Sequence, residues 1–438
     1  MQNQGIRDAR SLGTPKLLVL GLQHMFAMFG ATVLVPALTG LSVSATLLFA
    51  GLGTLFFHFV TKGKVPAFLG SSFAYLAGYP AIAPNGEAAL LPYACVGVAA
   101  SGLLYLILAA LVRGFGANRV MRFFPPVVTG PIIICIGMTL ANSAINNCTG
   151  SWDIALVAIL TVVIFNIWGK GMLRIIPILL GVLVSYVYAA VTGRVDFSGV
   201  ASAAWIGLPV KMENTVFSLI GNCDANLLVT AIIAIMPIAF ATMIEHIGDI
   251  CAISSTVGAN FIADPGLHRT LLGDGLATSI ASLFGAPANT TYGENTGVLA
   301  LTKIYDPLVI RIAAVFAMIL SFCPKFEAII NTIPSGIVGG ISFVLYGMIS
   351  AIGVRNVVEN KVDFTNSRNL IIAAVILVCA LGFNSVGGVT FAIAGVNINL
   401  SGLAIAAIAG ILLNAILPGN DYEFDEGSNE PESASLRV

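Results

Sequence analysis

The chain alternates between long apolar stretches and short polar connections from residue 17 to residue 417. Hydrophobic residues make up 57% of its 438 residues and charged residues only 9%, whereas a soluble domain has about 25% charged residues. A helix needs about 20 apolar residues to cross a bilayer core about 30 Å thick. We therefore predict an all-α polytopic membrane protein with fourteen membrane segments. They fall near residues 17–38, 43–61, 66–84, 90–112, 124–146, 151–169, 173–192, 226–251, 268–285, 287–303, 307–323, 326–351, 368–384 and 401–417.

The basic residues support this count and give an orientation. Cytoplasmic connections of membrane proteins carry an excess of Lys and Arg. With fourteen spans and both termini inside, all but three of the 20 Lys and Arg residues fall in cytoplasmic segments. The three outside are Arg194, Lys211 and Lys325. We expect a multi-pass protein of the cytoplasmic (inner) cell membrane, with both termini in the cytoplasm.

The longest connection, residues 193–225, divides the chain into two halves of seven spans each. An odd number of spans forces the second half into the opposite orientation, as in an inverted-topology repeat. Gln23-His24 in the first span resembles Glu245-His246 in the eighth. The same offset places Ser72, in the polar middle of the third segment, against Glu294 in the tenth. The sequence therefore predicts a 7+7 inverted repeat.

Residues 286–299 interrupt the apolar pattern most strongly. This stretch carries a carboxyl group, two amides, three hydroxyl-bearing threonines and two glycines between apolar segments. Its first half has extended character, and a short helix is expected just after Glu294. Irregular polar backbone at membrane depth is tolerated only inside protein or along a wet cavity. Interrupted helices of this kind form the binding sites of transporters, so we predict the binding site here.

The acidic residues give the sharpest functional signal. Glu245 and Asp249 lie in the eighth span four residues apart, and so on one helical face, while Glu294 lies in the tenth. Carboxyl groups in mid-membrane are costly and are functional by default. These spans contain no Lys or Arg in their apolar parts, so protonation is the cheapest neutralisation, as a proton-coupled carrier requires. Asp274, between two glycines, is expected to contact another helix instead.

The predicted site favours a small, planar, neutral ligand with both N–H and C=O edges. Its carboxyl groups supply hydrogen-bond acceptors, and the start of a half-helix supplies backbone N–H donors. An anion would suit the helix end but would be repelled by Glu245 and Glu294. Phe73, Tyr75 and Tyr292 could stack on a flat ring or cover it.

Several of these motifs together resemble the nucleobase–ascorbate transporter family. Glu-Asn-Thr-Gly at residues 294–297, followed by Thr-Lys at 302–303, is similar to the family signature. Gln-His at 23–24 is similar to the Gln-His pair of its first span. Residues 245–248 and 69–74 resemble the corresponding elements of its bacterial uracil-transporting members. The resemblance covers nearly the whole chain apart from its termini and the 193–225 loop.

The resemblance implies a domain organisation. Short antiparallel strands are expected in the broken segments 3 and 10, and the protein is expected to form a homodimer. The implied mechanism is proton-driven uptake by alternating access. The implied parts are a core domain of spans 1–4 and 8–11 (17–112 and 226–323), a gate domain of spans 5–7 and 12–14 (124–192 and 326–417), an extracytoplasmic loop (193–225) and an acidic cytoplasmic tail (418–438).

The resemblance also implies roles for single residues. Glu245 and Glu294 would bind uracil, and the backbone N–H groups of Phe73 and Gly293 would meet its carbonyl oxygens. Some relatives have His where this chain has Asp249, so a proton relay through that imidazole does not transfer. The remaining implied residues are Ser72 and Tyr292 lining the site, Tyr346 closing over it, Glu245 and Asp249 coupling protons, and Gln23, His24 and Asn295 supporting the core.

Glu294 bears on the substrate, since xanthine-transporting members tend to have Gln at this position. A carboxylate accepts hydrogen bonds but cannot donate them, which favours uracil. No cofactor other than the proton, no metal, no nucleic acid and no catalytic residue is expected.

Alternatives remain at two levels. Gln23, His24, Phe73 and Tyr346 could serve packing alone, and Ser72 could bond its own backbone. The chain could instead be a xanthine or purine permease of the same fold, or an anion exchanger or channel on the same architecture. A membrane enzyme is disfavoured because no Ser/His/Asp spacing and no His-Glu-x-x-His motif occurs.

Overall fold

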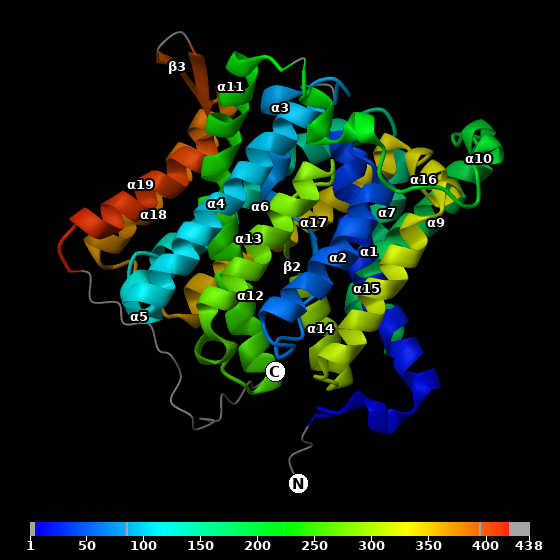
Figure 1. Cartoon of the computed structure of the whole chain (residues 1–438), viewed down its shortest axis with the longest axis horizontal. Coiled ribbons are helices and arrows are strands. Elements are labelled where there is room, and N and C mark those ends of the chain that lie inside the picture. Colours follow the sequence, from blue (N-terminus) through cyan, green and yellow to red (C-terminus); the bar gives the residue numbers. More distant parts are fainter. Residues whose placement is uncertain (1–4, 85, 222, 394–395, 420–438) are drawn as a thin grey trace.

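The computed structural model describes residues 5–84, 86–221, 223–393 and 396–419. It shows a predominantly helical protein with two small antiparallel sheets of two strands each (Figure 1). The first half contains η1 (Ala9–Leu12), α1 (Thr14–Thr39), α2 (Val43–Val60), β1 (Leu69–Ser71), η2 (Ala74–Ala77), α3 (Tyr79–Ile82), α4 (Leu91–Phe115), α5 (Ala117–Met121), α6 (Pro126–Cys148), α7 (Trp152–Trp168), α8 (Met172–Ile175) and α9 (Pro177–Val191).

The second half begins after the 193–225 connection, which itself holds only short helices. The remaining elements are α10 (Ser198–Ser202), η3 (Met212–Asn214), η4 (Val216–Leu219), α11 (Ala225–Ile235), η5 (Met236–Ile238), α12 (Ala239–Val257), η6 (Ile262–Gly266), α13 (Leu267–Leu283), β2 (Asn289–Thr291), α14 (Gly293–Thr302), α15 (Pro307–Ser321), α16 (Pro324–Asn331), α17 (Ser335–Glu359), α18 (Ser367–Ser385), β3 (Val389–Ile393), β4 (Val396–Leu400) and α19 (Gly402–Ile416).

The predicted fold class is confirmed. Among the described residues, seven helical segments are long and apolar enough to cross a membrane alone, and α7, α9 and α19 are shorter apolar helices. The third and tenth predicted segments contain β1 and β2, which pair in antiparallel register from Leu69 opposite Thr291 to Ser71 opposite Asn289. Each strand is followed by short helices, so both segments are broken as expected.

Two parts of the prediction need correction. The predicted span 326–351 is wrong at its start, because α16 is a separate short helix bent by 84° from α15. Pro324 begins α16 and Pro334 precedes α17, and proline cannot continue a preceding helix. The hairpin of β3 and β4 is a second feature that the helical prediction missed. Residues 420–438 of the predicted acidic tail lie outside the described residues.

The helices pack in two sets, and the most extensive helix–helix contacts lie within each set. In one set α13 lies along α4 and α2, and α15 lies along α2 and α1. In the other set α17 lies along α6 and α7, and α18 lies along α19 and α6. Glycines allow the closest approaches: a Cβ on Gly102 of α4 would lie 2.6 Å from the carbonyl oxygen of Gly275 on α13, and one on Gly353 of α17 would lie 2.8 Å from that of Gly130 on α6. Small residues at such interfaces are typical of membrane helix pairs.

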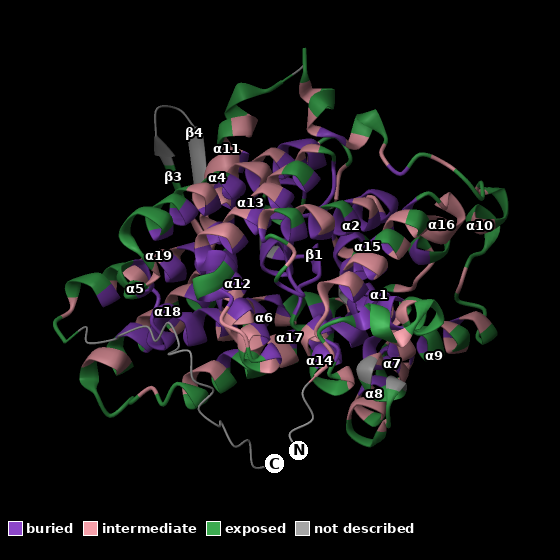
Figure 2. Cartoon of the chain, turned by 60° about the horizontal axis from the view of Figure 1, so that its bottom comes forward, coloured by how far each residue is buried: buried purple, intermediate pink, exposed green. Residues whose placement is uncertain are grey.

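The strand pair β1–β2 lies inside the molecule, next to α2, α12 and α13. Figure 2 shows buried residues concentrated around these elements and exposed residues toward the periphery. All six strand residues are buried. The two interrupted segments therefore meet in the middle of the first helix set, where the sequence predicts the binding site.

Candidate functional site

The backbone of the strand pair is hydrogen-bonded at membrane depth. Beyond the strand ladder, the Ser72 N–H donates to the Ala288 oxygen at 2.9 Å and the Tyr292 N–H donates to the Phe68 oxygen at 3.0 Å. Side chains complete the pairing, since Thr54 Oγ1 accepts from the Leu69 N–H at 2.9 Å. Unpaired backbone in hydrocarbon costs several kcal/mol per group, so this pairing is what permits two interrupted spans.

Helix α14 starts directly where β2 ends. Tyr292 occupies its N-cap position, and Gly293 and Glu294 form its first turn. The first N–H groups of a helix have no partner within that helix. Within the described residues, the N–H groups of Phe73, two residues after β1, and of Gly293, the first residue of α14, have no hydrogen-bond partner. Two backbone donors are therefore available where the two broken segments meet.

Three carboxyl groups converge at this point. Glu245 and Asp249 project from α12, and Glu294 from the first turn of α14. Asp249 Oδ1 would lie 3.7 Å from a Cβ on Gly293, the residue before Glu294, and Glu245 lies one helical turn before Asp249 on α12. None of the three forms an ion pair with a Lys or Arg of the described residues. Glu245 Oε2 is a buried atom without a hydrogen-bond partner there. In the part of the chain that the structure describes, the three acids thus lie together without a Lys or Arg partner.

Open space borders these acids. A Cβ placed on Gly248 of α12 or on Gly297 of α14 would meet no atom within 4 Å. One placed on Gly293 would meet only Asp249 Oδ1, at 3.7 Å. Gly293 and Gly297 are exposed, and Glu245, Asp249 and Glu294 are partly buried. Among the described residues, nothing therefore packs against Gly248 or Gly297, and only Asp249 approaches Gly293.

The predicted aromatic residues take different positions. Phe73 and Tyr346 pack edge to face, with ring centroids 6.1 Å apart and planes at 79°, which brings α17 of the second helix set to the end of β1. The Tyr292 side chain instead contacts β1 and α1. Its hydroxyl donates to the Ser71 carbonyl oxygen at 3.0 Å and accepts from Thr32 Oγ1 at 3.2 Å. The Tyr292 ring therefore braces the strands, and its hydroxyl is already engaged.

The predicted supporting residues join α1 to α14. Asn295 Nδ2 donates to the His24 carbonyl oxygen at 3.1 Å and lies 3.2 Å from His24 Nδ1. Because the amide donates, Nδ1 is the accepting nitrogen of this imidazole. Gln23 Oε1 and Ser72 Oγ are buried atoms with no hydrogen-bond partner among the described residues. His24 and Asn295 thus hold α14 against α1.

The structure adds a buried polar cluster that the sequence did not reveal as a group. Thr291 Oγ1 donates to Asp249 Oδ2 at 2.8 Å and lies 3.4 Å from His246 Nδ1. The same His246 nitrogen is 3.4 Å from Asp274 Oδ2, and both side chains are fully buried. The predicted helix contact of Asp274 is confirmed, with α12 as the partner helix. The polar triplet 290–292 was the only sign of this cluster in the sequence. Residue spacing could not show that Thr291 contacts Asp249 and His246.

Comparison with known proteins agrees with this architecture. The profile of the Permease family (Xan_ur_permease) matches residues 15–389. The uracil permease of Bacillus caldolyticus is 42% identical over 98% of this chain and 98% of its own length. The uracil permease of Bacillus subtilis (strain 168) is 41% identical over 95% of each chain, and that of Escherichia coli (strain K12) is 38% identical over 91% of this chain and 90% of its own.

Solved structures share the fold at low identity. The transmembrane domain of the cyanobacterial bicarbonate transporter BicA aligns with a TM-score of 0.60 and 15% identity, over 93% of this chain and all of that one. The murine Slc26a9 anion transporter in its inward-facing state aligns with a TM-score of 0.62 and 11% identity, over 91% of this chain and 67% of that one. With the family profile covering most of its length and full-length relatives near 40% identity, the chain belongs to the Permease family.

Proposed function

We propose that this protein imports uracil together with protons, as a secondary transporter of the cytoplasmic membrane. The observation that carries the proposal is that Glu245, Asp249 and Glu294 lie together, with no Lys or Arg partner among the described residues, beside two free backbone donors and uncrowded glycines. Full-length relatives that are named uracil permeases support this substrate.

The donors and acceptors of the site match those of uracil. Uracil is flat and neutral, with ring N–H groups and carbonyl oxygens on alternating edges. Under the proposal, Glu245 and Glu294 accept hydrogen bonds from ring N–H groups, and the N–H groups of Phe73 and Gly293 donate to the carbonyl oxygens. Hydrogen bonds to a charged acceptor such as Glu294 are the stronger kind, and a protonated Glu245 still accepts through its carbonyl oxygen. The Phe73 and Tyr346 rings would then cover the base.

Proton coupling follows from the isolation of the acids. A charged carboxyl group can face water, but it is costly when the site closes at membrane depth. A proton taken up by Glu245 removes that charge and relieves its repulsion with the carboxyl groups beside it. Asp249 keeps the hydroxyl of Thr291 as a donor. In this proposal Glu245 is the coupling acid, and Asp249 assists it where some relatives have His.

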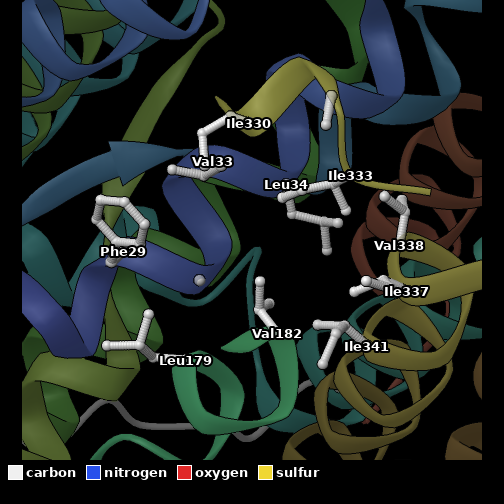
Figure 3. Close-up of a pocket in the computed structure, with 12 residues that line it drawn as sticks. Phe29, Val33, Leu34, Leu179, Val182, Ile330, Ile333, Ile337, Val338 and Ile341 are labelled. Atoms are coloured by element: carbon white, nitrogen blue, oxygen red, sulfur yellow. The ribbon is translucent and has the colours of Figure 1, made fainter. Parts of the chain in front are cut away.

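The two helix sets would be the moving parts. We assign α1–α4 and α11–α15 to a core domain that carries the site, and α6–α9 and α17–α19 to a gate domain. An apolar cleft between the two sets supports this division (Figure 3). Its lining comes from α1 on one side, from α9 and α17 on the other, and from α16 and its connection to α17: Phe29, Gly30, Val33, Leu34, Ala37, Leu179, Val182, Ile330, Ile333, Ile337, Val338 and Ile341. Movement of the core against the gate gives alternating access. We propose a homodimer with both termini in the cytoplasm.

Two rivals make different predictions. A xanthine or purine permease would bind the larger fused ring. An anion exchanger would use the same fold, as the bicarbonate and anion transporters above do, but the three carboxyl groups repel an anion. The test is a binding panel on purified protein, with uracil, thymine, xanthine, adenine and bicarbonate across a pH series. Uracil should bind most tightly, and preferential binding of a purine or of bicarbonate would overturn the proposal.

A further inference from the structure

The segment before α1 lies across the ends of the helices that carry the candidate site. We call residues 5–12 the N-terminal strap. Ile6 forms a parallel β-bridge with Ile304, just after α14. The Ile6 N–H donates to the Lys303 oxygen and the Tyr305 N–H donates to the Ile6 oxygen, both at 2.8 Å. Figure 1 shows this dark-blue segment at the same end of the molecule as the C-terminal end of α14.

The fit of the strap is close and specific. A Cβ on Gly5 would lie 2.2 Å from the Tyr305 ring, so only glycine allows the backbone to lie against it. The fully buried Ala9 donates its N–H to Asp306 Oδ2 at 2.8 Å. The other oxygen of Asp306 caps α15 through the Leu308 N–H at 2.9 Å. The strap is thus fastened to the α14–α15 connection by backbone and side-chain bonds.

One strap residue reaches the other helix of the site. Arg7 Nη2 donates to the carbonyl oxygens of Val257, at 3.1 Å, and Gly258, at 3.3 Å. These are the last carbonyl groups of α12, whose C-cap Gly258 has the left-handed conformation. A cation near a helix C-terminus is favourable, because the terminal carbonyls carry partial negative charge. Arg7 therefore joins the end of α12 to the strap, and through it to the end of α14.

These two helices carry the carboxyl groups of the site. Glu245 lies 12 residues before Val257 on α12, which is about 18 Å along a helix. Glu294 lies in the first turn of α14, whose last turn ends beside Lys303. A tilt of about 5° at the end of α12 would move Glu245 by more than about 1 Å over that length. The side chains of a binding site must be placed to within about 0.5 Å. The distance between the C-terminal ends of α12 and α14 therefore affects the positions of Glu245 and Glu294.

We infer that Arg7 is a positioning residue for the candidate site, and that the N-terminal strap fixes the spacing of α12 and α14. Arg7 is exposed and does not touch the site, so it acts through the helix ends. The inference rests on the proposed function for its substrate readout, but its geometric part stands apart from the identity of the ligand.

The test compares Arg7→Gln with Arg10→Gln, a matched change on an exposed Arg of the same strap. Uracil binding to the purified proteins is measured by calorimetry. Arg7→Gln should weaken binding by about three- to tenfold, Arg7→Lys should restore most of the loss because it keeps a cation at the helix end, and Arg10→Gln should bind as the parent does. Parent-like affinity in Arg7→Gln, or an equal loss in Arg10→Gln, would overturn the inference.

A second measurement needs no ligand. Spin labels at the exposed positions Ser255 on α12 and Leu301 on α14, in a background without the native cysteines, report the distance between the two helix ends. Arg7→Gln should broaden or shift this distance distribution, and Arg10→Gln should not. An unchanged distribution overturns the inference even if affinity falls. If the parent fails to bind uracil while Arg7→Gln still changes the distance, the proposed function fails and the positioning role holds.

Discussion

At the scale of single residues, ligand recognition depends on which groups surround the three carboxyl groups. Glu245, Asp249 and Glu294 could be identified from the sequence because an ionisable side chain in an apolar span is costly and usually has a functional role. The sequence could not show that the Tyr292 hydroxyl is engaged by Ser71 and Thr32, since that depends on the register of β1 with β2. The structure therefore gives the carboxyl groups and the free backbone N–H groups the main role in recognition.

Glu294→Gln should weaken uracil binding about tenfold or more, the range for a lost hydrogen bond to a charged group. An amide has only one accepting oxygen and would turn N–H donors toward the ring N–H groups. Binding to the purified variant is measured by calorimetry. Glu359→Gln, the same change at the exposed end of α17, is the control and should bind normally. Parent-like binding by Glu294→Gln would remove this residue from the site.

Glu245→Gln should separate transport from proton coupling. The variant keeps a polar side chain but cannot gain or lose a proton, so a pH gradient can no longer drive accumulation. Proteoliposomes loaded with uracil measure exchange, and empty proteoliposomes under a pH gradient measure accumulation. Accumulation should fall more than exchange, which is itself lowered because Glu245 also binds the ring. Equal loss of both activities, or of neither, would count against Glu245 as the coupling acid.

At the scale of elements, the strand pair β1–β2 is the least tolerant part of the fold. Gly70 lies in the middle of β1 with the Tyr292 ring directly against it. A Cβ there would lie 2.5 Å from Tyr292 Cζ and 2.8 Å from Thr32 Oγ1. The close packing of the three residues explains how a strand can pass between helices at this depth.

Gly70→Ala should therefore lower the free energy of unfolding by about 1–3 kcal/mol, the usual cost of overpacking, and should weaken uracil binding with it. Thermal unfolding of the purified protein, followed by intrinsic fluorescence, measures the first effect. Gly114→Ala on α4 is the matched control, because a Cβ at Gly114 meets no atom within 4 Å. If Gly70→Ala unfolds at the same temperature as the parent, the strand packing described above is incorrect.

The elements also show which parts of the fold were predictable. Helices such as α2 and α4 follow directly from apolar length. The strand in each broken segment was expected from the family resemblance rather than from periodicity. The bend between α15 and α16 was missed because the apolar residues on both sides of Pro334 were assigned to one span, although Pro324 and Pro334 flank α16. The β3–β4 hairpin was missed because its segment falls between two predicted spans.

At the scale of the whole molecule, α16 is the link between the proposed core and gate. Glu327 on α16 accepts three hydrogen bonds from the start of α2: Ser42 Oγ at 2.8 Å, the Val43 N–H at 2.9 Å and Ser44 Oγ at 2.7 Å. These bonds fasten α16 to the core side. Movement of the gate relative to the core would then pivot after α16, where Pro334 precedes α17.

Cross-linking across the apolar cleft tests this movement. Val33 on α1 and Ile337 on α17 both line the cleft (Figure 3). In a cysteine-free background, the pair Val33→Cys and Ile337→Cys joined by a short bifunctional reagent should stop uracil transport and leave equilibrium binding intact. Each single-cysteine variant treated with the same reagent is the control. Normal transport by the cross-linked pair would exclude movement of α1 against α17.

We propose that the carboxyl groups of the site, which have no Lys or Arg partner among the described residues, take up a proton and a flat base together. Titration calorimetry of uracil in two buffers with different ionisation enthalpies measures the protons bound with each uracil. We predict a net uptake of protons with uracil at neutral pH and an affinity that falls as pH rises, because the complex holds more protons than the free protein. Equal heats in both buffers at every pH, with an affinity that does not change with pH, would contradict the account.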